Sequence, residues 1–158
     1  MTCGTGIEYV RSYAADALGK IGPRAKAAVP SLTKLLKDED ESVRVAAVEA
    51  LGKIGAEAKT AVPALARLLK DNDLAVPCCA AEALGKIGAE VETAVLAITE
   101  LLKDWYPEAR KTAAEALGQI GPEAKTAVPA LTELLNDENK DVRKAAAEAL
   151  AKIRKEKK

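Results

Sequence analysis

The side chains best suited to covalent chemistry in this 158-residue sequence are three cysteines, Cys3, Cys78 and Cys79. A cysteine nucleophile normally needs a base to remove its proton, and the sequence contains no histidine. A structural zinc ion needs about four ligands, and the cysteine spacing supplies no such set. Adjacent residues on a helix point about 100° apart, which weakens joint capture of a soft ion. We therefore expect no enzyme activity, no metal and no cofactor, with a cysteine-dependent catalyst as a less favoured alternative.

Aromatic side chains are a second chemically distinctive group because they are rare. Aromatic residues make up 3% of the sequence, phenylalanine is absent, and the aromatic positions are Tyr9, Tyr13, Trp105 and Tyr106. Tyrosine and tryptophan offer a large amphipathic area at a modest cost in entropy, and they dominate the energetics of many interfaces. Their presence favours recognition over catalysis.

Charge and composition exclude several classes of function. Lys plus Arg and Asp plus Glu number 24 each, so the chain has no basic excess for binding a nucleic-acid backbone. Apolar residues make up 49% of the sequence, yet no run approaches the roughly 20 residues of a membrane span. The free cysteines fit a reducing compartment. We expect no nucleic-acid or membrane partner and a cytoplasmic location, or recombinant production if the chain is engineered.

The elements that position these residues follow from an internal repeat. Ala-Leu-Gly-Lys-Ile-Gly or a close variant begins at residues 17, 50, 83, 116 and 149, always 33 residues apart. A motif based on Ala-Val-Pro keeps the same step from residue 28 onwards. Copies in register at this period indicate one repeat domain spanning residues 1–158. Residues 1–6 are expected to form a short tail and residues 140–158 a C-terminal capping helix.

Each unit contains two amphipathic segments with helical spacing. Val43, Leu51 and Ile54 lie on one face of the first segment, and glycine ends that segment because it tolerates the left-handed conformation. Pro63 lies within the first two turns of the second segment. Neither helix can bury its apolar face alone, so neighbouring units must stack. We predict an all-α fold of about nine helices in two layers, at about 7–20, 24–37, 41–53, 57–70, 74–86, 90–103, 107–119, 123–136 and 140–157.

The pattern Leu-Leu-Lys-Asp-x-Asp-x-x-Val-Arg-x-Ala-Ala-x-x-Ala-Leu-Gly-x-Ile-Gly resembles HEAT repeats over nearly the whole chain. It is most similar to the short HEAT-like repeats named after phycobilisome lyases. The resemblance implies a right-handed α-solenoid whose concave surface is lined by the helices that carry Val-Arg. It also implies that the arginines bridge the turns to an aspartate column, Asp38, Asp71, Asp104 and Asp137. No catalytic residue of the lyase-type relatives carries over to this sequence.

The units match one another closely, which is typical of a consensus-derived or engineered scaffold; a recently duplicated natural array is the alternative. The third unit departs most from the pattern. Pro77 replaces an arginine, and Leu96 replaces a proline found in the other units. These changes either repack the unit locally or shape a pocket.

Other departures replace polar or small residues by aromatic or apolar ones, mostly in the first three or four units. They predict one surface for recognition, on the concave row, formed or bordered by Tyr9, Tyr13, Val45, Leu74, Cys78, Trp105 and Tyr106. The alternative is that the aromatic residues shield the N-terminal end and the adjacent loop. We expect a scaffold that binds a protein or peptide, with a self-associating module, such as a homodimer, as the second hypothesis.

Overall fold

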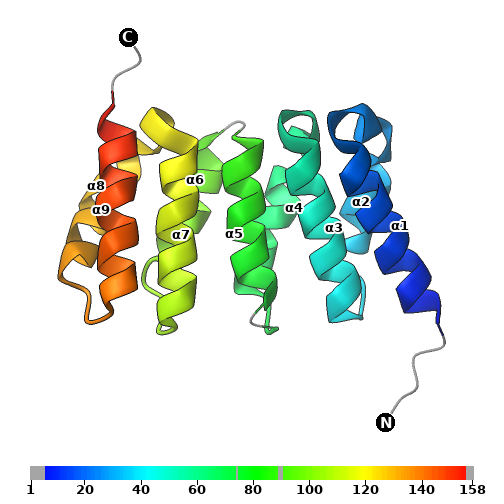
Figure 1. Ribbon diagram of the computed structural model, residues 1–158, viewed down its shortest axis with the longest axis horizontal. Coiled ribbons are helices and arrows are strands. Elements are labelled where there is room, and N and C mark those ends of the chain that lie inside the picture. The colour runs from blue at the N-terminus through cyan, green and yellow to red at the C-terminus, as the bar shows by residue number, and fades with distance from the viewer. Residues whose placement is uncertain (1–5, 74, 89–90, 156–158) are drawn as a thin grey trace.

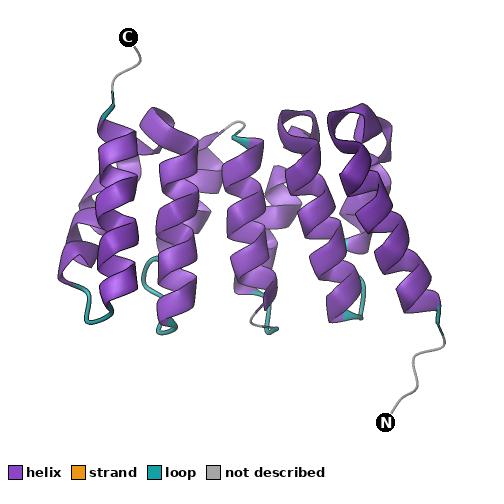
Figure 2. Cartoon of the chain, in the orientation of Figure 1, coloured by secondary structure: helices purple, strands orange, loops and turns teal. Residues whose placement is uncertain are grey.

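The computed structural model describes residues 6–73, 75–88 and 91–155, and these residues form helices and short turns without a β-strand (Figure 2). Nine segments are α-helical: α1 (Ile7–Ile21), α2 (Val29–Leu35), α3 (Glu41–Ile54), α4 (Val62–Arg67), α5 (Ala75–Ile87), α6 (Val91–Leu101), α7 (Pro107–Ile120), α8 (Val128–Glu133) and α9 (Lys140–Arg154). Of the tail expected at residues 1–6, only Gly6 is described, as the N-cap of α1.

The helices form two rows. The odd-numbered helices stand side by side, each packed against the next, and the even-numbered helices lie behind them (Figure 1). Side chains between the rows form a continuous apolar core, in which Val43, Leu51 and Ile54 are fully buried. The predicted all-α solenoid is therefore confirmed.

The even-numbered row differs from the prediction of continuous helices at 24–37, 57–70 and 123–136. In each of these stretches a 3-10 segment leads into a short α-helix that begins at the residue before a proline. Proline lacks the N–H that would continue the hydrogen bonding from the preceding turn. Because Leu96 takes the proline's place in the third unit, α6 is a longer regular helix. Six helices, α1, α3, α5, α6, α7 and α9, have 11 residues or more.

Two glycines in each of the first four motifs shape the junction between units. The first allows close packing of helices, and the second ends the helix. A Cβ built on Gly118 would lie 3.0 Å from the Cα of Ala149, so glycine allows α7 and α9 to approach closely. Gly121 ends α7 with φ of 78°, a conformation that side chains disfavour. In the last unit Ala151 and Arg154 occupy these two positions, where no further described helix packs against α9. The terminal departure from the motif therefore has a physical reason.

Across the described residues, no helix combines the length and the apolar character that crossing a bilayer requires.

Candidate binding surface

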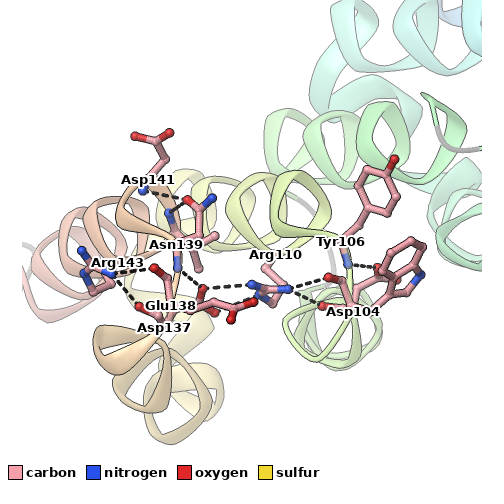
Figure 3. A network of polar contacts seen from close by, with 10 residues as sticks. Asp104, Tyr106, Arg110, Asp137, Glu138, Asn139, Asp141 and Arg143 are labelled. Atoms are coloured by element: carbon pink, nitrogen blue, oxygen red, sulfur yellow. Dashed lines mark hydrogen bonds and ion pairs between the residues drawn. The ribbon is translucent and has the colours of Figure 1, made fainter.

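Buried arginines connect the turns of successive units. The Nη1 group of Arg110 donates hydrogen bonds to the carbonyl oxygens of Asp104 and Trp105, both at 2.9 Å (Figure 3). Its Nε and Nη2 groups donate to the two carboxylate oxygens of Asp137, at 2.8 and 2.9 Å. The hydrogen bond from Arg110 lowers the pKa of Asp137. Arg110 thus binds its own turn and the next one.

The second unit uses the same arrangement, and the first unit shows its contact to the next turn. Arg44 donates to the carbonyl oxygens of Asp38 and Glu39, at 2.8 and 3.0 Å, and pairs with the carboxylates of Asp71 and Asp73. Burial opposes the charge of Arg44, but its hydrogen bonds and attraction to these carboxylates hold its pKa above the ordinary value. Arg11 donates to Asp38 at 3.0 Å. The bridges implied by the family resemblance are therefore present.

The third turn, residues 71–73 before α5, differs because Pro77 replaces the arginine that would join it to the fourth turn, residues 104–106. The carboxylate of Asp104 accepts a hydrogen bond from the N–H of Tyr106 at 2.9 Å. Among the described residues, no cationic side chain forms an ion pair with this carboxylate. Asp104 is thus the one member of the aspartate column without an arginine bridge in the described structure.

A groove of about 1270 Å³ opens at this turn, and we call it the Trp105 groove. It lies among α4, α5, α6 and the start of α7, and its lining includes Asp71, Pro77, Cys78, Leu96, Asp104 and Trp105. The two main departures of the third unit, Pro77 and Leu96, therefore share one groove. Trp105 is 80% exposed, and its ring meets that of Tyr106 edge to face, with centroids 4.7 Å apart.

Two smaller hollows lie along the odd-numbered row. The Tyr13 hollow, of about 450 Å³ between α1 and α3, includes Tyr13, Val45 and Glu49. The Cys79 hollow, of about 210 Å³ between α3 and α5, includes Glu49, Cys79 and Lys86. Glu49 lines both hollows, and Cys79 lines both the second hollow and the Trp105 groove. The three depressions therefore adjoin one another across α1, α3, α5 and α7.

Acidic side chains outnumber basic ones along these depressions. The acidic residues that line them are Asp16, Glu41, Glu49, Asp71, Glu82, Glu100, Asp104 and Glu108, and the basic residues are Lys53, Arg67, Lys70 and Lys86. The whole chain carries equal numbers of each sign. The surface thus has a local negative excess that the composition does not reveal.

The structure distributes the predicted recognition residues as follows. Cys78, Trp105 and Tyr106 line the Trp105 groove, and Tyr13 and Val45 line the Tyr13 hollow. Tyr9 is exposed on α1 and lines none of the three depressions. Leu74 lies outside the described residues. Figure 3 shows the ring of Tyr106 projecting away from the polar network around Arg110.

The two described cysteines, Cys78 and Cys79, lack the features of an activated nucleophile. Burial and nearby carboxylates raise the pKa of the Cys79 thiol to about 11, so it stays protonated at neutral pH. Burial also raises the pKa of Cys78, although a hydrogen bond with Thr112 acts in the opposite direction. Within the described ranges, no group of three cysteine, aspartate or glutamate side chains could hold a metal ion. Both cysteines act as half-buried packing residues.

Sequence reasoning missed the polar side of the Trp105 groove. It identified the loss of an arginine at Pro77 and placed Asp71 and Asp104 in the aspartate column, but it did not assign a binding role to Asp71, Asn72 or Asp104. The signal was available, because a lost bridge leaves its acceptor groups behind. The sequence alone did not indicate that α6 and the start of α7 leave those groups accessible.

These features define the protein as an α-solenoid repeat protein with a grooved face. The family profile of HEAT repeats matches residues 7–61 and 95–158, and that of the PBS lyase HEAT-like repeat matches residues 80–104. The chain belongs to the HEAT repeat family.

Solved structures with the same fold include engineered proteins and a natural lyase complex. One engineered protein shares 30% identity over 92% of this chain and 74% of its own, with a TM-score of 0.72. A chain from the complex of CpcE and CpcF of phycocyanin lyase from Nostoc sp. PCC7120 shares 32% identity, with a TM-score of 0.78. That match covers 94% of this chain and 60% of the lyase chain.

A third similar structure is that of computationally designed armadillo repeat proteins for modular peptide recognition. It shares 31% identity over 81% of this chain and 65% of its own, with a TM-score of 0.64. Comparison with curated proteins gives no match. The chain is thus a repeat scaffold similar to designed proteins made for peptide recognition.

Proposed function

We propose that this protein is a non-enzymatic scaffold that binds an extended segment of a protein or peptide partner. The segment lies across the odd-numbered helices, from the Tyr13 hollow to the Trp105 groove. The observation that carries this proposal is the adjacency of the three depressions through Glu49 and Cys79. The resemblance to HEAT repeats, in which the helices with Val-Arg line the concave side, supports this proposal, because solenoids bind extended ligands on their concave surfaces.

The exposure of two aromatic residues supports the proposal. Tyr13 is 70% and Trp105 is 80% exposed, and each lines a depression. Large exposed aromatic residues beside a groove are typical anchors for a partner, because burying them gains much apolar contact. We propose that Tyr9, Val45, Cys78 and Tyr106 form or border the same surface; the other predicted residue, Leu74, lies outside the described residues.

The likeness to designed proteins for modular peptide recognition also supports peptide binding, whereas the likeness to a phycocyanin lyase chain raises the question of catalysis. Cys78 and Cys79 are poorly suited to such chemistry, because their half-buried thiols have raised pKa values. We therefore propose binding without catalysis, in a cytoplasmic or recombinant setting.

The proposal is tested by selecting ligands from a displayed library of random dodecapeptides. The affinity of the best peptide is then measured by calorimetry for the wild type and three variants. Trp105→Ala and Tyr13→Ala should each weaken binding by about 2 kcal/mol, roughly 30-fold, as expected for anchor residues. Lys144→Ala is the matched control, because Lys144 lies exposed on α9 away from the depressions. Equal effects of all three substitutions, or failure to select any peptide, would contradict the proposal.

Self-association is a second candidate because α1 exposes residues that the later units bury. Val10 is 69% exposed, whereas its equivalent Val43 is fully buried, and Ile21 and Ile54 differ in the same way. In α3 these residues pack against the preceding unit. The α1 face could instead meet a second copy of the chain.

Sedimentation equilibrium over a wide concentration range distinguishes this candidate from a monomeric scaffold. A dimer that Val10→Lys dissociates would support self-association through α1. A monomer at all concentrations would exclude it and leave the peptide-binding proposal intact. A Lys144→Glu variant controls for the general effect of a surface charge change.

A further inference from the structure

We propose that the third turn of the array binds the guanidinium group of an arginine side chain supplied by the partner. This inference rests on the proposed peptide-binding function and names the side chain that anchors the partner. Its basis is Pro77, which stands where the other units have Arg11, Arg44, Arg110 and Arg143.

The turn of the fourth unit provides the template for this site. Each nitrogen of the Arg110 guanidinium donates a hydrogen bond, through Nη1 to two successive carbonyl oxygens and through Nε and Nη2 to both oxygens of Asp137. Arg44 makes the equivalent contacts to two carbonyl oxygens and to Asp71. The acceptors thus form a set that is complementary to a planar guanidinium group.

The third turn has the same acceptors at the equivalent repeat positions. The carbonyl groups of Asp71 and Asn72 correspond to those of Asp104 and Trp105 in the next turn. The carboxylate of Asp104 corresponds to that of Asp137. Asp71, Asn72 and Asp104 all line the Trp105 groove, so a group from outside can reach this turn. The N–H of Tyr106 holds one oxygen of Asp104 in place.

Nothing on α5 can replace the missing guanidinium. Pro77 is buried in the first turn of the helix and has neither a side-chain donor nor an N–H group. In the described structure, Arg67 and Lys70 line the groove without forming an ion pair with Asp104. The carboxylate therefore keeps its capacity for an external cation.

The rest of the groove suits an arginine side chain better than a lysine side chain. Exposed Leu96 and the ring of Trp105 offer apolar and aromatic surface for the alkyl stem and the flat face of the guanidinium. Glu100 and Glu108 line the same groove and add to its negative charge. Lysine would carry the charge, but one ammonium group cannot match the paired carbonyl and carboxylate acceptors.

The test is an NMR titration with two small probes, Nα-acetyl-arginine methylamide and its neutral citrulline analogue. The backbone amide of Tyr106 is the reporter, because it donates directly to Asp104. The probes are added to the wild type, Pro77→Arg, Pro77→Ala and Asp104→Asn. Pro77→Arg supplies the guanidinium from within the chain, and Pro77→Ala is its control, since it removes proline without adding a cation.

The arginine probe should shift the Tyr106 signal saturably in the wild type and in Pro77→Ala. Its dissociation constant should be at least about 10-fold lower than that of the citrulline probe. Both Asp104→Asn and Pro77→Arg should lose this preference. Equal binding of the two probes to the wild type, or an unchanged preference in Pro77→Arg, would overturn the inference. Because the probes are single residues, this result is independent of peptide selection. Selected peptides that bind without any arginine preference would leave only the proposed function standing.

Discussion

At the scale of single residues, the turns depend on arginine and aspartate pairs that are held away from water. Arg110 is 7% exposed, and its three donor nitrogens bind two turns at once. Removing one member of such a pair is costly, because the other charge stays buried without its partner. The aspartate column therefore contributes to stability wherever its arginine is present, and we propose that it serves binding where the arginine is absent.

This arrangement predicts a defined pH dependence. The hydrogen bond from Arg110 lowers the pKa of Asp137 in the folded state below its unfolded value of about 3.9. The resulting stability is fully present above the unfolded pKa and is lost as the pH falls through the folded pKa. Asp137→Asn should therefore cost about 2 kcal/mol at pH 7 and progressively less below pH ~4.

Urea unfolding of the wild type and Asp137→Asn across this pH range measures the difference directly. Asparagine keeps an oxygen that can accept the N–H of Asn139, so the variant changes mainly the charge. Glu138→Gln is the control, because its exposed carboxylate lies beside the pair. A difference between wild type and Asp137→Asn that does not change with pH would refute the linkage.

At the scale of elements, close packing between odd-numbered helices sets the repeat. Gly118 faces Ala149 so closely that an added Cβ would lie 3.0 Å from its Cα. Helix propensity alone predicts that Gly118→Ala stabilises the protein by up to about 1 kcal/mol. Packing predicts the opposite sign, a loss of about 1–3 kcal/mol, because α7 and α9 must separate.

Thermal and urea unfolding of Gly118→Ala decide between these two effects. The matched control is Ala151→Gly, at the equivalent position on α9, where no described helix packs beyond it. That variant should lose only the propensity difference, about 1 kcal/mol. A stabilised Gly118→Ala variant would show that the helices accommodate the methyl group without strain.

The repeat itself predicted much of the fold from sequence, and local interruptions account for what it missed. The 33-residue period, the amphipathic faces and the terminal glycines predicted the rows and their stacking. Helix periodicity did not reveal the 3-10 segments before Pro30, Pro63 and Pro129, because 3-10 and α-helical segments share similar apolar spacing over a few residues. The prolines were the available signal.

The candidate surface was also predictable only in part from the sequence. Comparison of repeat columns identified Trp105, Tyr106, Tyr13 and Val45 as departures, and the structure places them beside depressions. The acidic lining and the role of Asp104 depend on which side chains converge from α4 to α7. Comparing repeat columns in the sequence does not show which side chains converge in space.

At the scale of the whole molecule, we propose that a partner segment spans several units along the odd-numbered row. The end units differ in character, with apolar residues exposed on α1 and charged residues such as Lys144 and Glu148 exposed on α9. The three adjoining depressions lie between α1 and α7. The binding energy should therefore come from the first four units and not from α9.

The most direct test is a map of backbone amide shifts on addition of the selected dodecapeptide. We expect simultaneous, saturable shifts of the amide signals around Tyr13, Glu49, Cys79 and Trp105. The amide signals around Lys144 should not move. Shifts confined to α1, or spread over α9, would contradict a partner that spans the three depressions.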